Sequence, residues 1–496
     1  MGNRTVSAFG LPAPHMQRIA RRGRLSLRNT AHAMNRRIIM QMLRMVFGGM
    51  LLIFVMACQS GEAAQRVAPV TLAEQPFKRA EPLIVGVGVH FGIGGNWGYD
   101  PDEALKAITR IGFDSTRDDF PWGGFDNDRP PNGLPFRLGA FLPRAVDAGI
   151  VPMVIVGHGN PTVKGGKPPV TVAGQDAFAG FTARAAKATA RFRPIYEIWN
   201  EWNMIDGLDA AMHKREGLPS ERRSAANYAS LALKAAKALR AAAPKARILV
   251  GGTGMDPGWA WAEAVFRGDA MKYADGFSVH LYNHCEPDLT KRTATNAIDQ
   301  AEDLQRRLHA IAKASVPVYV TEVGWPTTTT SPCPLSREAS ANNMAQFLFW
   351  AAATPWMKGV WLYQLKDQGR NPSDFEDNFG ILDYDYRDKP AACMVRAAIA
   401  MIKETETWSL QRPMDDIFIL TAKRGTSTRV IAWTSRPAIK AQFVPEGGKP
   451  VSYRSLCVGS SVGAATVPLG PVPVVIDLGA RPAVSGKVIL DPEGRQ

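Results

Sequence analysis

Cysteine is scarce in this chain, and its spacing argues against a metal centre. There are five Cys among 496 residues, and no two of them form the Cys-x-x-Cys pair typical of zinc sites. Apart from Cys58, four remain: Cys285, Cys333, Cys393 and Cys457. An even number is consistent with disulfides if the chain is exported, and Cys285 and Cys333 each follow a predicted strand end, so they could bridge neighbouring loops.

The glycine motifs that bind nucleotides are also incomplete. Gly86-Val87-Gly88 is followed by Phe91 where a dinucleotide fingerprint needs its third glycine. Gly165-Gly166-Lys167 leads to Pro168 where a phosphate loop needs Ser or Thr. We therefore expect no cofactor and no bound metal.

Negative charge is missing from the first fifty-seven residues, which contain nine Arg and no Lys, Asp or Glu. The net charge of +14 thus leaves 14 − 9 = +5 for the rest of the chain. Because most of the positive charge lies in the first fifty-seven residues, the net charge does not indicate a basic surface that binds nucleic acid. We therefore expect no nucleic-acid partner.

The apolar run near the N-terminus is too short to span a bilayer comfortably, but it fits an export signal. Arg36, Arg37 and Arg44 precede the run Val46 to Ala57, which ends before Cys58. A start at Met34 would give a signal of usual length.

The residues around the end of this run resemble a bacterial lipobox. Val55-Met56-Ala57-Cys58 implies an export signal over residues 1–58, lipidation of Cys58, and a periplasmic or outer-membrane-anchored protein. The alternative is ordinary cleavage after Ala63 or Ala64.

Strand and helix patterns alternate from residue 83 to residue 405, after an Ala-, Gln-, Glu- and Pro-rich linker over residues 59–82. The expected strands are Leu83–His90, Phe113–Phe120, Val151–Gly157, Tyr196–Glu201, Arg247–Gly252, Phe277–Tyr282, Val316–Val323 and Gly359–Leu365. Each is followed by a helical pattern. This predicts the α/β class and a closed (β/α)8 TIM barrel, and a doubly wound open sheet remains the alternative.

The sequence pattern changes over residues 406–496, where the apolar residues show no helical periodicity. Short strands separated by Gly, Pro and Ser are expected at Ile417–Ala422, Arg429–Thr434, Ile439–Val444, Val451–Leu456 and Val472–Leu478. The pattern predicts a small all-β module resembling a sandwich. We expect it to brace the barrel, because no cluster of exposed aromatic residues is evident in it.

Two of the barrel strands end in a carboxylate beside a tryptophan. Tyr196-Glu197-Ile198-Trp199-Asn200-Glu201-Trp202-Asn203 follows the fourth strand pattern, and Thr321-Glu322-Val323-Gly324-Trp325-Pro326 the seventh. In a parallel barrel all strands end on one face, so Glu201 and Glu322 can share a pocket. Two facing carboxylates are what glycoside hydrolysis needs. Glu197 shares the strand parity of Glu201 but lies deeper, as a buried hydrogen-bonding residue.

These two motifs resemble those of the retaining glycoside hydrolases of clan A, and the chain is most similar to family 39, in particular to bacterial members associated with exopolysaccharide production. The resemblance covers the barrel. It implies that Glu201 is the general acid/base, Glu322 the nucleophile, and Asn200 a donor to the sugar 2-hydroxyl or to Glu322. Many relatives have Pro where this chain has Trp202.

Further residues fit the same face. His280 and Tyr282 alternate on the sixth strand, and Arg117 on the second resembles the clan's arginine that ionises the nucleophile. Trp361 resembles its sugar-stacking tryptophan. His90 and His158 end strands and are expected to line the pocket. Other aromatic residues suited to a saccharide cleft, although each alone could pack in the core, are Trp97, Trp122, Trp202, Trp325 and Trp356.

The sequence thus predicts a retaining glycosidase that cleaves β-linked bonds in a poly- or oligosaccharide, which could be an exopolysaccharide. A second hypothesis is a catalytically silent glycan-binding or matrix-assembly protein that keeps the same cleft. Sugar identity and linkage depend on the loops of the barrel face.

Overall fold

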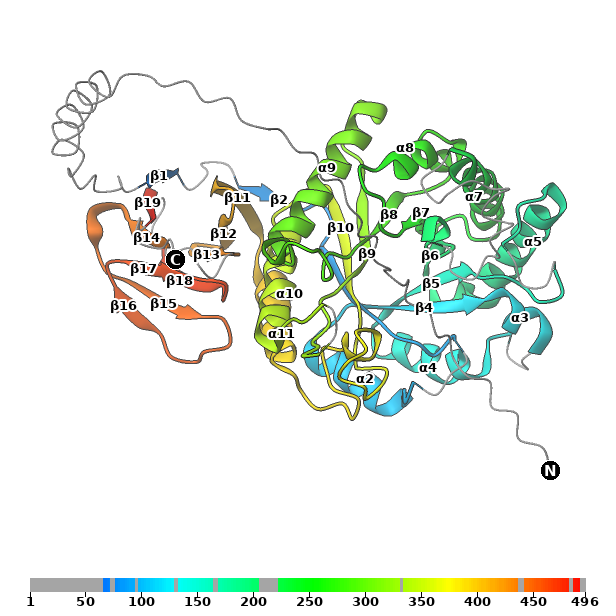
Figure 1. Ribbon diagram of the computed structural model, residues 1–496, viewed down its shortest axis with the longest axis horizontal. Helices are drawn as coiled ribbons and strands as arrows, with labels where there is room; N and C mark the ends of the chain where they lie inside the picture. The colour runs from blue at the N-terminus through cyan, green and yellow to red at the C-terminus, as the bar shows by residue number, and fades with distance from the viewer. Residues whose placement is uncertain are drawn as a thin grey trace, which may run out of the picture. The chain divides into compact units, whose positions relative to one another are not determined.

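The computed structural model describes residues 66–71, 76–93, 97–128, 133–163, 168–204, 222–330, 333–435, 441–480 and 485–490. Within these ranges the chain forms a parallel β/α barrel followed by an antiparallel β module (Figure 1). The export signal, Cys58 and the first part of the expected linker lie outside the described residues. Among those that are described, no helix combines the length and apolar character needed to cross a membrane.

The barrel is closed by eight parallel strands. In chain order they are β3 (Ile84–Gly88), β4 (Ser115–Pro121), β5 (Val151–Gly157), β6 (Ile195–Ile198), β7 (Ile248–Thr253), β8 (Gly276–Leu281), β9 (Val318–Val323) and β10 (Met357–Leu362). The last strand, β10, pairs with both β9 and the first strand, β3. This closure confirms the TIM barrel and excludes the open sheet.

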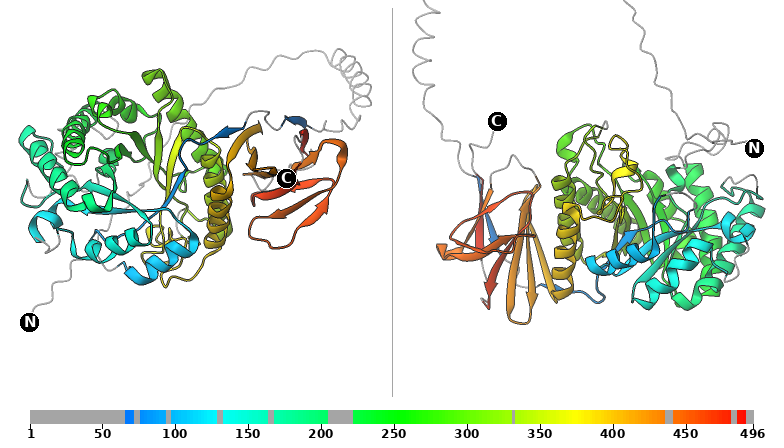
Figure 2. Two further views of the ribbon diagram at one scale, coloured as in Figure 1. Left: turned by 180° about the vertical axis from the view of Figure 1, so that it is seen from behind. Right: turned by 90° about the horizontal axis from the view of Figure 1, so that it is seen from below.

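The helices form the outer ring of the barrel (Figure 2). They are α2 (Pro101–Ile111), α3 (Trp122–Asp128), α4 (Phe136–Asp147), α5 (Val172–Thr189), α7 (Arg222–Ala242), α8 (Ala260–Phe266), α9 (Ala294–Ala312), α10 (Arg337–Ala352) and α11 (Pro390–Glu404). The helices begin and end at residues that can cap them. For example, the Asp100 side chain accepts hydrogen bonds from the first backbone amides of α2, and Gly112 ends the helix with a positive φ.

Strands β5, β7 and β9 are buried on both faces, which explains their largely apolar sequences, whereas the buried strand β4 carries the polar residues Arg117, Asp118 and Asp119. Inside the barrel, Met153, Ile195, Leu249, Tyr319 and Trp361 form a separate apolar cluster. It fills the barrel below the ends of the strands. Side chains that follow the strand ends are therefore supported from beneath by a packed core.

Two antiparallel sheets make up the C-terminal module. The smaller sheet has the order β1-β19-β14-β17 and the larger β16-β15-β18-β13-β12-β11-β2. The strands after the barrel are β11 (Thr407–Met414), β12 (Ile417–Arg424), β13 (Ser427–Thr434), β14 (Ala441–Pro445), β15 (Val451–Ser455), β16 (Val462–Ala464), β17 (Val467–Leu469), β18 (Val474–Gly479) and β19 (Ser485–Leu490). Side chains from both sheets share one core, so the module is a sandwich.

The expected linker is not wholly a linker. Residues 66–71 form β1, which pairs with β19, and residues 77–78 form β2, which pairs with β11. The polar, Pro-containing composition of this segment did not indicate its two edge strands. An edge strand is defined by its pairing with a neighbouring strand and needs no apolar pattern of its own.

The module packs through its larger sheet onto helices α10 and α11 of the barrel. Trp408, Phe418 and Trp433 of this sheet belong to the same apolar core as the barrel. The disulfide Cys393–Cys457 joins α11 to the end of β15. Helix α10 is consequently buried all round from Ser340 onward and has no solvent-exposed face there.

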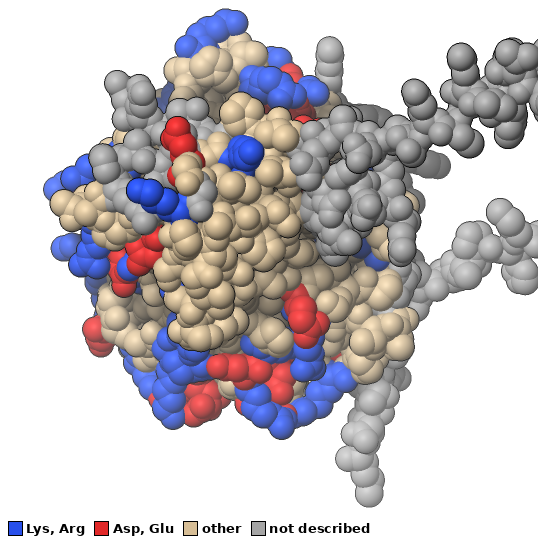
Figure 3. All heavy atoms as spheres, turned by 90° about the vertical axis from the view of Figure 1, so that its left-hand side faces the viewer, with Lys and Arg blue, Asp and Glu red and all other residues tan. Residues whose placement is uncertain are grey.

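The side of the molecule that carries the module shows a central uncharged area bordered by Lys, Arg, Asp and Glu (Figure 3). Among the described residues of the module, the large apolar side chains that are exposed are Val67, Val458, Val462 and Val472. None of these four is aromatic, so the described part of the module shows no cluster of exposed rings for sugar stacking.

Candidate active site

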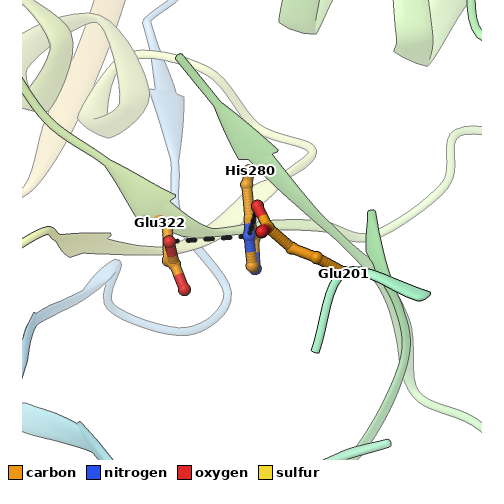
Figure 4. Close-up of side chains that lie close together, drawn as sticks. All are labelled: Glu201, His280 and Glu322. Atoms are coloured by element: carbon orange, nitrogen blue, oxygen red, sulfur yellow. Dashed lines mark hydrogen bonds and ion pairs between the residues drawn. The ribbon is translucent and has the colours of Figure 1, made fainter. Parts of the chain in front are cut away.

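A cavity of about 530 Å³ opens at the C-terminal ends of the barrel strands. Both predicted carboxylates line it: Glu201 lies three residues after β6, and Glu322 lies on β9. The two side chains point toward each other, with His280 of β8 between them (Figure 4). The topology thus brings together residues that are far apart in the sequence.

The two carboxylates lie close together. An oxygen of Glu201, a ring nitrogen of His280 and an oxygen of Glu322 all lie within 4.8 Å of one another. Carboxyl groups are about 5–5.5 Å apart in retaining glycosidases and about 6.5–9.5 Å apart in inverting ones. The closest oxygens of the two carboxylates thus lie nearer to each other than the carboxyl groups of an inverting enzyme do, which favours the retaining arrangement.

Arg117 of β4 donates hydrogen bonds to three other residues of the site. Its Nη1 donates to Glu322 at 2.5 Å, its Nε to Glu197 at 2.7 Å, and its Nη2 to the Asn200 side-chain oxygen at 2.8 Å. The Arg117 side chain is only 4% exposed. One buried cation therefore orients the side chains of three other residues.

Glu322 is held in its ionised form. Burial raises the pKa of this carboxyl, but the charges of His280 and Arg117 and the hydrogen bonds from Tyr282 and Arg117 outweigh it, so its pKa lies below the usual value. The Tyr282 hydroxyl donates to Oε2 at 2.5 Å. An ionised carboxylate is the form that can act as a nucleophile.

His280 connects the two carboxylates. Its Nδ1 lies 2.8 Å from Glu201 Oε1 and 3.6 Å from Glu322 Oε2. Arg117, which can only donate, approaches Nε2 at 3.2 Å. We infer that Nδ1 carries a proton in both the neutral and the positively charged form of His280. This N–H donates a hydrogen bond to Glu201. Burial lowers the pKa of His280, but the charges of Glu322 and Glu201 outweigh this and raise it.

Glu197 is the deeper hydrogen-bonding residue that the sequence predicts. It is 0% exposed and accepts from Arg117 and from the Thr321 hydroxyl at 2.7 Å. Its buried charge is thus paired, and it lies beneath the cavity rather than in it.

The backbone around Glu201 has an unusual conformation. Trp199 and Glu201 have φ values of 66° and 46°, in the left-handed region that costs energy for residues other than glycine. The Glu201 amide donates to the Gly252 carbonyl at 2.8 Å. Trp202 is 2% exposed and packs against Trp199 with ring centroids 5.0 Å apart. Trp202 therefore secures the turn that presents Glu201.

The substrate-binding role expected for Trp122, Trp325 and Trp361 is wrong. Trp122 is 2% exposed, and the other two are fully buried. Trp122 packs against Phe178 and Phe181; Trp325 donates to Asn283, and Trp361 lies inside the barrel and donates to Ser115. The surfaces of these rings are buried among neighbouring side chains, so they pack within the fold and do not line the cavity.

Other aromatic residues line the cavity instead. They are Trp97, Tyr282, Tyr363, Phe375 and Phe379. Of the other tryptophans expected near the cleft, Trp202 is buried, and Trp356 packs against Trp350 away from it. Phe375 and Phe379 lie well after the end of β10, in a segment without a periodic pattern that could have marked them in the sequence, whereas Tyr363 lies in the strand expected over Gly359–Leu365.

His90 and His158 line the cavity, as expected from their place after β3 and β5. His158 Nε2 lies 2.6 Å from Asp119 Oδ1. Sequence analysis missed Asp119, although its position near the end of β4, two residues beyond Arg117, was the signal that could have found it.

A metal ion could use the ligand atoms of Glu201, His280 and Glu322, given their spacing. However, Arg117 already holds a positive charge 2.5 Å from Glu322, and a second cation beside it would be repelled. The donor set therefore fits acid–base chemistry by the side chains themselves better than a metal centre.

Comparison with known proteins agrees with this geometry. Residues 145–357 match the family model for cellulases of glycosyl hydrolase family 5. This stretch contains Glu201, His280 and Glu322. The chain is similar to the clan A glycoside hydrolases. By this match it is a glycosidase, and the clan A enzymes to which it is similar retain the anomeric configuration. No curated protein matches the chain in sequence.

Solved structures share the fold at low sequence identity. A family 39 glycoside hydrolase from the gut symbiont Bacteroides cellulosilyticus WH2 is 19% identical, with a TM-score of 0.60 over 80% of this chain and 81% of that one. A monomeric β-xylosidase from Caulobacter crescentus CB15 is 15% identical, with a TM-score of 0.50 over 84% and 98%. A variant of a family 5 (subfamily 18) protein from Streptomyces cattleya, in complex with Manβ1-4GlcNAc, is 22% identical, with a TM-score of 0.50 over 64% and 80%.

Proposed function

We propose that this glycosidase hydrolyses β-linked bonds of a poly- or oligosaccharide, with Glu322 as nucleophile and Glu201 as general acid/base. The observation that carries the proposal is the pair of carboxylates within 4.8 Å of each other in one cavity. The β linkage is supported by the names of two similar structures, a β-xylosidase and a complex with a β1-4-linked disaccharide.

In the first step Glu322 attacks the anomeric carbon. The bond from that carbon to the leaving oxygen breaks while Glu201 gives its proton to this oxygen, which leaves a glycosyl ester on Glu322. Tyr282 and Arg117 hold the Glu322 oxygens at 2.5 Å each, so the carboxylate is oriented before the substrate binds.

In the second step Glu201 acts as a base. It takes a proton from water while the water oxygen bonds to the anomeric carbon and the bond to Glu322 breaks. Asn200 has its side-chain oxygen fixed by Arg117. Its amide group is thus the part left to donate to the sugar, which fits the role proposed for it at the 2-hydroxyl.

The decisive experiment measures both turnover and stereochemistry. Purified enzyme is incubated with β-linked oligosaccharides and with the host's own exopolysaccharide, and NMR follows the anomer formed first. We expect retention. Glu201→Gln and Glu322→Gln are each expected to lower kcat more than about 10³-fold while glycan binding remains, whereas Glu338→Gln, on the surface of α10, should change neither.

A silent glycan-binding protein is the second hypothesis. If the wild type binds these glycans but never releases reducing ends, that hypothesis replaces ours. Initial formation of the inverted anomer would contradict the double-displacement mechanism.

We also propose export and lipid anchoring through Cys58. The support is the arginine-flanked apolar run that ends at Val55-Met56-Ala57-Cys58. Radiolabelled palmitate should be incorporated by the wild type and not by Cys58→Ala. An unlabelled wild type would rule out the anchor.

A further inference from the structure

The side of the cavity that carries Glu201 has two methionines that the proposed mechanism does not use. Met204 ends the short helix η3 (Trp202–Met204), and Met255 lies two residues after β7. Both line the cavity, and the Met255 side chain is 55% exposed. An apolar side chain that is open to a cavity gains free energy when the apolar surface of a ligand covers it. Met204 and Met255 are called the methionine pair below.

Asn203 fixes the backbone that carries Met255. It is the last residue of the Trp-Asn-Glu-Trp-Asn motif and is 2% exposed. Its side-chain amide donates to the Met255 carbonyl at 3.1 Å, and its side-chain oxygen accepts from the Gly254 amide at 2.9 Å. Both polar groups of this buried side chain are thus used on the loop after β7. The loop is therefore tied to the segment that carries Glu201 and Met204.

Gly254 allows the methionine pair to lie close to the Glu201 carboxylate. A β-carbon at Gly254 would be 2.5 Å from Met204 Cγ and 2.9 Å from Glu201 Oε1. Both distances are shorter than side-chain atoms tolerate, so a larger residue would displace one of the two side chains. Met204 and the Glu201 carboxylate consequently lie against the same glycine, and Met255 is the next residue along the chain.

The proposed mechanism determines on which side of the cavity the leaving group lies. Glu201 can protonate the leaving oxygen only from hydrogen-bonding distance, about 2.6–3.2 Å. Glu322 attacks the anomeric carbon from the face opposite that oxygen. The part of the substrate that leaves is therefore on the Glu201 side, next to the methionine pair.

Methionine side chains are suited to the ring of a sugar. The thioether chain is apolar, polarisable and adaptable in shape, so it packs against the C–H groups on one face of a pyranose. It carries no charge and is only a weak hydrogen-bond acceptor. A leaving group without a ring would leave the exposed surface of Met255 uncovered.

We propose that the methionine pair binds the sugar residue that leaves in the first step, and that Met255 determines specificity for this leaving group. The inference rests on the proposed function, because it concerns the same reaction. One face of the leaving sugar packs on Met255 and Met204 while its glycosidic oxygen lies at Glu201. Transfer to a sugar hydroxyl in place of water uses the same contact in reverse, with Glu201 taking the proton of that hydroxyl.

The test compares two substrates that share a glycosyl group and differ in the leaving group. The wild type is first given β1-4-linked tetramers of xylose, glucose and N-acetylglucosamine. The tetramer that it hydrolyses fastest is paired with the β-fluoride of the glycosyl group cleaved from it, because a fluoride ion is too small to reach the methionine pair. Met255→Ala should lower kcat/KM for the tetramer by about 10-fold or more and change that for the fluoride less than about 2-fold.

A second measurement follows the fate of the glycosyl group on Glu322. With the fluoride as donor and the leaving sugar added as acceptor, Met255→Ala should lower the ratio of transfer to hydrolysis by about 10-fold. A variant that merely damages the fold or the two carboxylates would lower turnover of both substrates and leave this ratio unchanged.

Two further variants serve as controls. Met255→Leu keeps an apolar surface and should retain the tetramer value within about 3-fold. Val172→Ala shortens a side chain that is 70% exposed at the start of α5, outside the cavity lining, and should change neither substrate. An equal loss on both substrates, or no loss on the tetramer, would overturn the inference while the proposed function stands. If the wild type hydrolyses neither the tetramers nor the fluorides, the proposed function fails and this inference fails with it.

Discussion

At the scale of single residues, the site depends on one arginine. Arg117 contacts Glu197, Asn200, His280 and Glu322, which come from three other strands or their ends. Loss of this cation would leave Glu197 buried without compensation, at a cost of about 3–5 kcal/mol. A variant of Arg117 would therefore report on folding as much as on catalysis, and Tyr282 is the better residue to test.

We predict that Tyr282→Phe moves the acidic limb of the kcat/KM profile to higher pH. The folded protein holds the pKa of Glu322 below its usual value, so the ionised form is lost only as pH falls through that lowered pKa. Without the Tyr282 hydroxyl, which donates to Glu322 at 2.5 Å, the pKa rises. A hydrogen bond to a charged group contributes about 1.5–3 kcal/mol, which corresponds to roughly 10–100-fold in kcat/KM at acid pH.

The measurement is a pH profile of kcat/KM for the wild type and the variant. Tyr453→Phe, in the β module, serves as the control and should leave the profile in place. An acidic limb that stays at the same pH in Tyr282→Phe would mean that another group sets it.

At the scale of elements, the loops after the strands shape the cavity, and a disulfide ties two of them. Cys285 follows β8 and lines the cavity, and Cys333 lies in the segment between β9 and α10. The residues next to Cys285, namely His284, Glu286 and Pro287, also line the cavity. The bridge therefore holds one wall of the cavity against its neighbouring loop.

We predict that the double variant Cys285→Ala/Cys333→Ala raises KM several-fold and lowers the free energy of unfolding by about 2–4 kcal/mol, the usual contribution of a native disulfide. The physical reason is that the freed loop samples more conformations, in both the folded and the unfolded protein. Steady-state kinetics and denaturant unfolding measure the two effects.

The second disulfide provides a matched control. Cys393→Ala/Cys457→Ala removes a bridge between α11 and the module, and neither of its cysteines lines the cavity. It should lower stability by a similar amount and leave KM unchanged. Equal KM values in the two double variants would show that neither bridge positions the cavity wall.

At the scale of the whole molecule, barrel and module form one folding unit. The larger sheet of the module shares its core with the barrel, and Gln346 of α10 links them through the Pro471 carbonyl and the Ser435 hydroxyl. Thr295 of α9 also contacts Ser435. Separation of the module would expose the apolar outer face of α10, which is why we interpret the module as a brace.

We predict a single cooperative transition when the protein is unfolded by heat or denaturant, because the larger sheet of the module shares an apolar core with the barrel. Gln346→Ala should lower the free energy of unfolding by about 1–3 kcal/mol, since the hydrogen-bonding groups of its partners lose a contact. Calorimetry and circular dichroism check both expectations. Two separate transitions would show that the module folds independently.

Site residues could be predicted from the sequence where they lie on a predicted strand or directly after one. Glu201, Glu322, His280, Tyr282 and Arg117 lie on strands or directly after them, and residues at the carboxyl ends of barrel strands meet on one face. The sequence therefore already predicted that their side chains lie close together on one face of the barrel. Glu376 and Phe375 lie in a segment after β10 with no periodic pattern, and sequence analysis missed them.

The tryptophans show the limit most clearly. A tryptophan near a strand end has the same sequence signature whether its ring faces the cavity, as Trp97 does, or packs beneath it, as Trp325 and Trp361 do. The outcome depends on the volume left by neighbouring side chains from other strands. That volume is a property of the assembled core.

The sequence by itself determined the eightfold alternation of strand and helix, the two carboxylates at strand ends and the all-β character of the C-terminal region. These follow from local periodicity and from the rule that parallel strands end on one face. Only the tertiary structure decided which strands the linker residues join, which rings line the cavity, which cysteines pair, and that His90 and Glu376 line the same cavity. Each of these depends on contacts between segments distant in the chain, and such contacts leave no local pattern.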